Sequence, residues 1–265
     1  MTEGGSPEYV RPQPGDGLFA AHLARYRWAV PRVVGLKVLD AGCGEGYGAD
    51  LLATVARYVT AVDYDPIAIE EARKKYARPN LEFQVMDCQS LAFPNGSFDA
   101  VVSFEVIEHL RDVLGFLQAV YRILRPGGIL LLSTPNAEIE ELHNRSSAQQ
   151  RVAYHVSPMT ARVLSTRLRQ VFGSASLFGQ RPRGGGFYNL LKWFDRFNLR
   201  HRLLTIDAKR RAASALGVCE YGGTEDFVVA EGMLRQSAIL LAVCQKVEGE
   251  VSSSRLGMAV EGGSE

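Results

Sequence analysis

The stretch Val38-Leu39-Asp40-Ala41-Gly42-Cys43-Gly44-Glu45-Gly46-Tyr47-Gly48 decides how this chain folds. An apolar run ends in an acidic residue, and glycines then occupy every second position. A backbone that turns from a strand into a helix while passing against a ligand needs residues without a Cβ atom, and alternating glycines allow that approach. Residues 49–56 have helix-forming composition. The stretch therefore predicts a strand, a nucleoside-binding loop and a helix whose N-terminus covers the ligand.

Two cofactor classes compete for this loop. The dinucleotide pattern G-x-G-x-x-G/A fails when its first glycine is Gly42, but it fits from Gly44, because Gly46 and Ala49 then follow at the required positions. Asp40 favours the other class, S-adenosylmethionine. A carboxylate at the strand end can accept a hydrogen bond from the ammonium group of a methionine moiety, whereas it would repel a pyrophosphate.

Two further predicted strands also end in acids. Residues 58–63 are β-prone and end at Asp63, about 20 residues after the loop, the spacing expected of a carboxylate that binds ribose hydroxyls. Residues 81–86 lead to Asp87, which can accept from the exocyclic amine of adenine. Both acids also fit helix caps or turn formers, which are common roles for Asp after a strand. Asp65 before Pro66 predicts a cap with proline at the first helical position.

Taken in order, these motifs resemble those of the class I S-adenosylmethionine-dependent methyltransferases. The resemblance rests on the D-x-G-x-G-x-G loop, on the acids at 63 and 87, and on the segments 93–102, 105–110 and 124–128. It covers residues 36–136 strongly and continues more weakly to 246.

By position, the resemblance implies that Asp40 contacts the methionine amino group, Asp63 the ribose and Asp87 the adenine. The other candidate cofactor contacts are Gly42, Cys43, Gly44, Gly46, Tyr64, Cys88 and Glu105. For Cys43 and Cys88, packing in the core is the plainer interpretation.

The alternation of strands and helices predicts an α/β fold with a mostly parallel sheet, and the resemblance implies a Rossmann-like, doubly wound, seven-stranded sheet with an antiparallel last strand. Expected strands are 37–40, 59–63, 81–87, 98–104 and 129–133, and expected helices are 18–30, 49–57, 66–76, 113–124 and 160–171. Strands that alternate with helices imply right-handed crossovers and a ligand at the carboxyl ends of the strands. The segments 175–179 and 238–244 resemble the closing strands of the methyltransferase sheet. On the expected entry helix, Tyr26 is a core residue or a cofactor contact.

The predicted domain spans residues 18–247, after a flexible N-terminus (1–17) and before a disordered tail (248–265). An insertion at about 180–235 is expected to form a substrate lid. From Arg181 to Arg211 it carries nine Lys and Arg against two Asp. This excess fits a lid helix with a solvated basic face, an anionic acceptor such as a phosphorylated or nucleotide-linked sugar, or peripheral contact with anionic lipid. RNA binding is the weakest of these interpretations, because the aromatic residues fall on the apolar face.

The segment Glu105-x-x-Glu108-His109 follows the fourth expected strand, beside the methyl donor. With His155 as a fourth ligand, Glu105, Glu108 and His109 could hold Mg²⁺ or Mn²⁺. The arrangement resembles the metal site of small-RNA 2′-O-methyltransferases and a similar cluster in ubiquinone-biosynthesis O-methyltransferases. Without a metal, His109 or His155 is the candidate general base and Glu105 a further catalytic candidate. A structural role for His155, before a cap at Ser157, remains open.

Composition sets limits on the class of protein. The chain has 265 residues and a net charge of +1, which gives no general attraction to nucleic acid. The cysteines at 43, 88, 219 and 244 form no C-x-x-C pair, so neither a zinc site nor a disulfide framework is expected. No apolar run is long enough for a membrane span and the N-terminus lacks a signal-peptide pattern, so we expect a cytoplasmic protein.

The sequence therefore predicts an S-adenosylmethionine-dependent methyltransferase that methylates an oxygen of a small molecule or of a sugar or glycoconjugate. Three alternatives stay open at this point: a metal-dependent 2′-O-methyltransferase of RNA, an NAD(P)-dependent oxidoreductase, and a methyltransferase-like binding protein without catalysis. The sequence does not indicate an oligomeric state.

Overall fold

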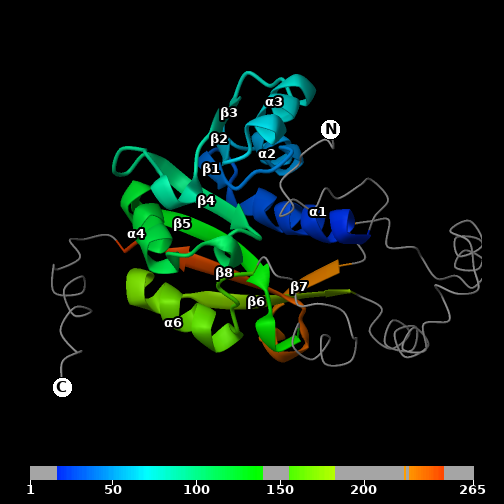
Figure 1. The fold of residues 1–265 in the computed structure, drawn as a ribbon, viewed down its shortest axis with the longest axis vertical. Helices are drawn as coiled ribbons and strands as arrows, with labels where there is room; N and C mark the ends of the chain where they lie inside the picture. The colour runs from blue at the N-terminus through cyan, green and yellow to red at the C-terminus, as the bar shows by residue number, and fades with distance from the viewer. Residues whose placement is uncertain (1–16, 140–154, 183–223, 225–226, 248–265) are drawn as a thin grey trace, which may run out of the picture.

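A computed structural model describes residues 17–139, 155–182, 224 and 227–247 (Figure 1). Its centre is an eight-stranded sheet of order β3-β2-β1-β4-β5-β8-β6-β7. The first five strands are parallel to one another. They are β1 (Lys37–Ala41), β2 (Tyr58–Asp63), β3 (Leu81–Val85), β4 (Phe98–Phe104) and β5 (Leu124–Pro135).

Three strands complete the sheet beyond β5. Strand β8 (Ile239–Gln245) inserts antiparallel between β5 and β6 (Ser176–Pro182), and β7 (Phe227–Glu231) pairs antiparallel with β6 at the edge. The α/β class, the mostly parallel order and the antiparallel last strand are confirmed. The expected number of seven strands is one too low, because β7 lies in the stretch that the sequence predicted to be a lid. Its residues Phe-Val-Val-Ala-Glu are β-prone, and β6 offers them an open edge.

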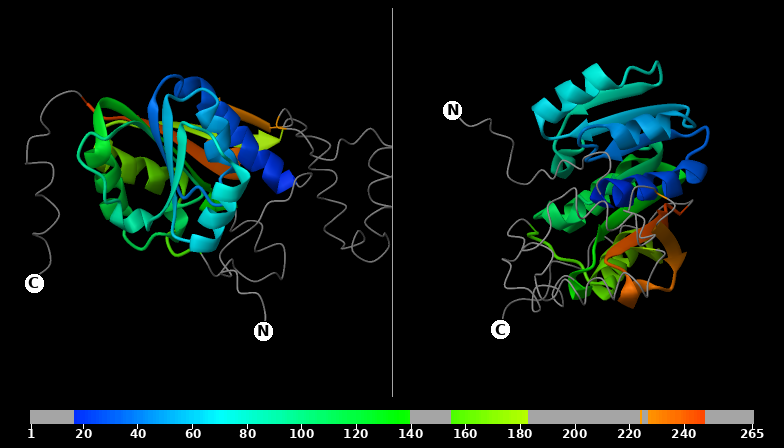
Figure 2. Two further views of the ribbon diagram at one scale, coloured as in Figure 1. Left: turned by 90° about the horizontal axis from the view of Figure 1, so that it is seen from above. Right: turned by 90° about the vertical axis from the view of Figure 1, so that its right-hand side faces the viewer.

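Helices cover both faces of the sheet (Figure 2). On one face lie α1 (Gly17–Ala29), α2 (Tyr47–Ala53) and α3 (Pro66–Lys75), and on the other lie α4 (Val113–Ile123) and α6 (Ala161–Phe172). The period-two alternation of the strands divides the core between these faces. Val38 and Val102 pack in the cluster under α1 to α3, whereas Leu39 and Val101 pack in the cluster under α4 and α6.

Helix starts follow the sequence closely. Asp65 accepts a hydrogen bond from the Ile67 N–H at 2.8 Å with Pro66 at the first helical position, so the predicted cap is confirmed. Helix α6 begins after Thr160, whose side chain accepts from the Val163 N–H. Within the described ranges, none of the helices has the length and apolar character that a membrane crossing requires.

Parts of the predicted domain plan lie outside the described residues. These are the N-terminus up to residue 16, the tail from residue 248, and residues 183–223. The last of these segments contains most of the expected lid with its apolar and basic residues. The described ends of that insertion belong to the sheet, since Gln180 to Pro182 complete β6 and residues 227–231 form β7.

The loop between β1 and α2 is held by the neighbouring strand. The N–H groups of Gly42 and Cys43 both donate to the carbonyl of Val62, at 2.8 and 2.9 Å. Gly42 has a φ of 83°, and a Cβ atom there would overlap the Val106 side chain. Gly42 is therefore required both by its backbone conformation and by the close approach of Val106, at the point where two strand ends meet.

We expect Gly42→Ala to destabilise the fold by more than Gly35→Ala, measured as the free energy of unfolding in urea. Gly35 has a similar φ of 71° but open space around its missing Cβ, so its substitution costs only backbone strain of about 1–2 kcal/mol. Gly42→Ala adds overpacking against Val106 of about 1–3 kcal/mol. Equal losses in the two variants would contradict the packing role.

Candidate functional site

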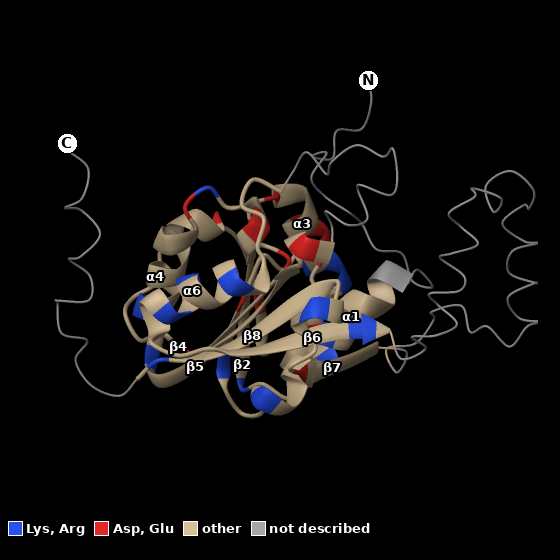
Figure 3. Cartoon of the chain, turned by 90° about the horizontal axis from the view of Figure 1, so that it is seen from below, with Lys and Arg blue, Asp and Glu red and all other residues tan. Residues whose placement is uncertain are grey.

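The strand-ending acids meet at the carboxyl edge of the parallel strands. Figure 3 shows acidic residues around α3 and the nearby loops, whereas Lys and Arg mark α6 and α1. The parallel register aligns Asp40 in β1 with Ala61 in β2 and Val102 in β4, so β1, β2 and β4 end side by side. Asp40, Asp63 and Glu105 therefore share one region, as the sequence predicted for a ligand site at this edge.

Asp40 is completely buried beneath the glycine loop. Its two carboxylate oxygens lie 3.2 and 3.3 Å from the Tyr26 hydroxyl, which donates from α1. Burial raises the pKa of the Asp40 carboxyl to about 7, an increase that the nearby Asp63 reinforces and the Tyr26 hydroxyl opposes. A carboxylate that is shielded from water is stabilised in its ionised form by a neighbouring cation. This suits the predicted role of Asp40, which is to bind the ammonium group of the methionine moiety.

Asp63 fixes the shape of the loop. One of its oxygens accepts from the Gly44 N–H at 2.8 Å and the other from the Asp65 N–H at 3.0 Å. Burial raises the pKa of Asp63, and these backbone donors lower it in part. Each carboxylate oxygen has a second lone pair, so Asp63 can accept from further hydroxyl groups while it holds Gly44 in place.

The third acid, Asp87, is less enclosed than Asp40 and Asp63. Asp87 is exposed and caps the 3-10 helix η2 (Cys88–Ser90) by accepting from the Gln89 N–H at 2.8 Å. Tyr64 is half exposed. Cys43 and Cys88 are buried in the cores on opposite faces of the sheet, and burial raises the pKa of both thiols. Both cysteines therefore pack in the core, as the plainer interpretation of the sequence held.

Arg25 is a site residue that the sequence analysis missed. It lies on α1 next to Tyr26, is only 1% exposed, and donates to Gln180 Oε1 at 2.8 Å. Its Nη2 atom lies 3.9 Å from Glu105 Oε2, and within the described residues Nε and Nη2 have no hydrogen-bond acceptor. Arg25 and Arg27 are the two arginines of an otherwise largely apolar helix, and this was the signal that could have revealed Arg25.

Glu105 has a strained backbone at the end of β4. It is the one non-glycine residue with positive φ in the described part of the chain, at 58°. Ser133 at the end of β5 holds it twice: the Glu105 N–H donates to the Ser133 carbonyl at 3.1 Å, and the Ser133 hydroxyl donates to Glu105 Oε1 at 2.8 Å. Strain of this kind is retained where the position of a side chain matters.

Glu108, His109 and His155 form a cluster beside Glu105. One carboxylate oxygen of Glu108 and one nitrogen of each imidazole lie within 4.8 Å of one another. Glu108 is 1% exposed, and Thr134 donates to its Oε2 at 3.0 Å, whereas Oε1 lacks a hydrogen-bond partner among the described residues. Burial, together with the Glu105 charge, raises the pKa of Glu108.

His155 lies in the short segment 155–160 before α6, which we call the strap. The Ser157 N–H donates to the Glu108 carbonyl at 2.9 Å, and the Ser157 hydroxyl donates to the Leu110 carbonyl at 2.7 Å. These bonds tie the strap to η3 (Ile107–His109) and bring the two imidazole rings to 5.2 Å between centroids. Of the four residues predicted to bind a metal, three converge, and Glu105 is directed to Ser133 and Arg25 instead.

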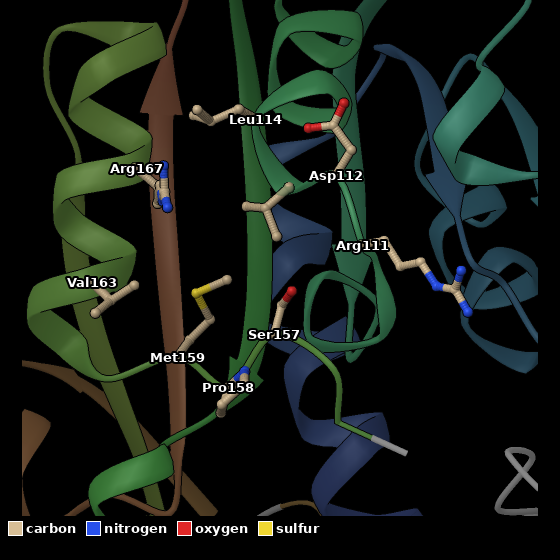
Figure 4. A pocket seen from close by; sticks show the side chains of 9 residues that line it. Arg111, Asp112, Leu114, Ser157, Pro158, Met159, Val163 and Arg167 are labelled. Atoms are coloured by element: carbon tan, nitrogen blue, oxygen red, sulfur yellow. The ribbon is translucent and has the colours of Figure 1, made fainter. Parts of the chain in front are cut away.

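A cavity of about 290 Å³ is lined by residues 157–159, by α6 and by the start of α4 (Figure 4). Met159, Val163 and Leu114 give it apolar walls, and Ser157 and Arg167 supply polar groups. In Figure 4 the Arg111 side chain extends away from the other lining residues. The cavity lies next to the cluster and does not include His109 or His155.

Comparisons with known proteins agree with this geometry. A family model described as a methyltransferase domain matches residues 39–132. A probable S-adenosylmethionine-dependent methyltransferase of Mycobacterium tuberculosis is 48% identical over 118 residues, which are 44% of this chain and 42% of the relative. A ubiquinone biosynthesis O-methyltransferase of Methylocella silvestris is 38% identical over 120 residues, 44% of this chain and 47% of that protein. The chain thus covers less than half the length of these relatives.

The fold also matches solved structures. One is an S-adenosylmethionine-dependent methyltransferase of Thermotoga maritima, described as a possible histamine N-methyltransferase. It superposes with a TM-score of 0.60 at 16% identity, over 87% of this chain and 90% of that one. At this identity the likeness concerns the fold alone.

The ionisation of Asp40 predicts how stability depends on pH. Between about pH 4 and pH 7 the unfolded chain has released this proton while the folded protein retains it, so the free energy of unfolding falls as the pH rises. One proton contributes at most about 1.4 kcal/mol per pH unit. Urea denaturation at pH 5, 6 and 7 should show a shallower fall for Asp40→Asn than for wild type. Asp63 and Glu108 remain in both proteins, so identical slopes would contradict the raised pKa of Asp40.

Proposed function

We propose that this chain, whose residues 39–132 form a methyltransferase domain of the class I S-adenosylmethionine-dependent type, binds that cofactor and transfers its methyl group to an oxygen of a small acceptor. The observation that carries the proposal is the position of Asp40. It is a buried carboxylate beneath a glycine loop, at the edge of a parallel sheet where ligands bind.

The methionine half of the cofactor fits the groups around Asp40. Its ammonium group would donate to the Asp40 carboxylate, and its carboxylate would accept from Nε and Nη2 of Arg25, which have no hydrogen-bond acceptor within the described residues. Leaving the donors of a buried guanidinium without acceptors is costly, so an anionic ligand group stabilises Arg25 where it lies. Asp63 would then accept from the ribose hydroxyls and Asp87 from the adenine amine.

The chemistry consists mainly of placement. The sulfonium group activates the methyl group, so alignment of the acceptor oxygen with the methyl carbon and the sulfur supplies much of the acceleration. A base must also remove the acceptor proton. His109 and His155 are the candidates, and the buried Glu108 carboxylate beside them stabilises an imidazolium once it has taken the proton.

We rank this base above a metal ion at the same place. The converging set offers one carboxylate and two imidazoles, and Mg²⁺ and Mn²⁺ prefer a set richer in oxygen. The second carboxylate expected from the sequence, Glu105, accepts from Ser133 and pairs with Arg25. The donor set thus fits these ions poorly, and we derive no catalytic step through a metal.

An oxygen acceptor is supported by the relatives that are named ubiquinone biosynthesis O-methyltransferases. Within the small molecules, we retain a sugar or glycoconjugate hydroxyl, and an anionic acceptor in particular. The excess of Lys and Arg between positions 181 and 211 supports this choice through charge complementarity.

Isothermal titration calorimetry tests the cofactor. Wild type is expected to bind S-adenosylhomocysteine, and Asp63→Ala to lose about 1.5–3 kcal/mol, roughly 10- to 150-fold in affinity. Asp65→Ala is the matched control, because it removes the cap of α3 two residues away and should lower stability while it preserves affinity. Preferential binding of NADH would overturn the assignment.

The catalytic cluster is tested by turnover, followed as S-adenosylhomocysteine release with the best acceptor from a panel of phenols, catechols and nucleotide-linked sugars. Replacing the histidine that acts as the base, by His109→Ala or by His155→Ala, should lower the rate about 10²- to 10⁴-fold with little change in cofactor affinity. Activity should survive EDTA. Restoration by Mg²⁺ or Mn²⁺ after chelation would favour the metal instead, and full activity in both variants would remove the cluster from catalysis.

A further inference from the structure

Helix α1 extends two adjacent polar side chains to the ends of two different strands. Tyr26 reaches Asp40 in β1, and Arg25 reaches Glu105 after β4. The Tyr26 contact is the closer of the two, and its hydroxyl is nearly equidistant from both Asp40 oxygens. A donor in this position restricts rotation of the carboxylate about its last bond.

We propose that Tyr26 is a positioning residue of the cofactor site, which holds the Asp40 carboxylate in place for the ammonium group of the methionine half. The inference rests on the proposed function. It adds that cofactor recognition requires helix α1 as well as the glycine loop.

The packing around the Tyr26 ring fixes the position of its hydroxyl. The ring is 4% exposed and meets Tyr47 and Phe104 edge to face, with centroids 5.9 and 5.1 Å away. Gly48 also borders the ring, because a Cβ atom there would overlap it. The glycine in the first turn of α2, after the loop motif, therefore makes room for Tyr26.

Tyr26 also acts on the charge of Asp40. Burial favours the neutral acid, and the hydrogen bond from Tyr26 favours the ionised form that an ammonium group requires. Of the other titratable groups, Asp63 in β2 raises the pKa of Asp40. The Asp40 charge in turn raises the pKa of Cys43, Tyr47 and Cys88. Of the two side chains that act on Asp40, Tyr26 is the one that stabilises the carboxylate.

The test compares two ligands in Tyr26→Phe, which keeps the ring and removes the hydroxyl. S-adenosylhomocysteine carries the amino-acid half, whereas 5′-deoxy-5′-methylthioadenosine has the same nucleoside and sulfur without it. At pH 7, Tyr26→Phe should bind S-adenosylhomocysteine about tenfold more weakly and methylthioadenosine as wild type does. Because affinity rises with pH as Asp40 ionises, the midpoint of this rise should move to higher pH in Tyr26→Phe.

Tyr58→Phe is the matched control. It removes another tyrosine hydroxyl that donates to a carboxylate, Glu82 Oε2 at 3.2 Å, from the partly exposed start of β2. It should leave both affinities unchanged. In an Asp40→Asn background, Tyr26→Phe should have almost no further effect on S-adenosylhomocysteine, since the two residues act through one contact.

The outcomes separate the two proposals. Equal loss of both ligands in Tyr26→Phe, or no loss of either, with wild-type S-adenosylhomocysteine binding intact, would overturn the positioning role and leave the methyltransferase proposal standing. Failure of wild type to bind S-adenosylhomocysteine would overturn the proposed function and this inference with it.

Discussion

The burial of the Asp40 carboxylate is the constraint on which the site depends. An ion removed from water costs several kcal/mol unless neighbouring groups compensate. In this fold, the Tyr26 hydroxyl on α1 donates to the carboxylate, and the glycine loop after β1 is held beside it by the Val62 carbonyl. The Asp63 carboxylate accepts a hydrogen bond from the Gly44 N–H, and it lies close enough to Asp40 to raise the pKa of that carboxyl. A cation offsets the repulsion between these two neighbouring carboxylates, and the ammonium group of the proposed ligand is such a cation.

The strands and helices could be predicted because their signals are local. Short apolar, β-prone runs indicated β1 to β4, and the Asp65-Pro66 pair indicated the start of α3. The glycine loop was also recognised, although two of its glycines have packing roles that the motif did not indicate. Gly42 leaves room for the Val106 side chain, and Gly46 leaves room for the Phe83 ring. Such contacts join elements far apart in the sequence, which a motif cannot reveal.

The side-chain partners at the site were less predictable for the same reason. Arg25 is fixed by Gln180, 155 positions away, and no local pattern links the two. The four-residue spacing from Glu105 to His109 suggested that both carboxylates face one point. The left-handed backbone of Glu105 turns its side chain toward Ser133 and Arg25 instead, and the prediction of four converging ligands had no means of detecting that torsion.

The link between α1 and Gln180 has a consequence for the order of folding. Gln180 accepts from Arg25 and donates to the carbonyl of Ala21, so β6 anchors the helix that completes the surroundings of Asp40. In the described part of the chain, β6 pairs with β7 and β8 alone, and both of these follow it in the sequence. During synthesis from the N-terminus, the glycine loop and its contacts with β2 therefore emerge early, whereas the anchor of α1 on β6 waits for β8, which ends at residue 245. A chain released too soon would contain every motif by which the site is recognised and still lack the anchored helix that shapes it.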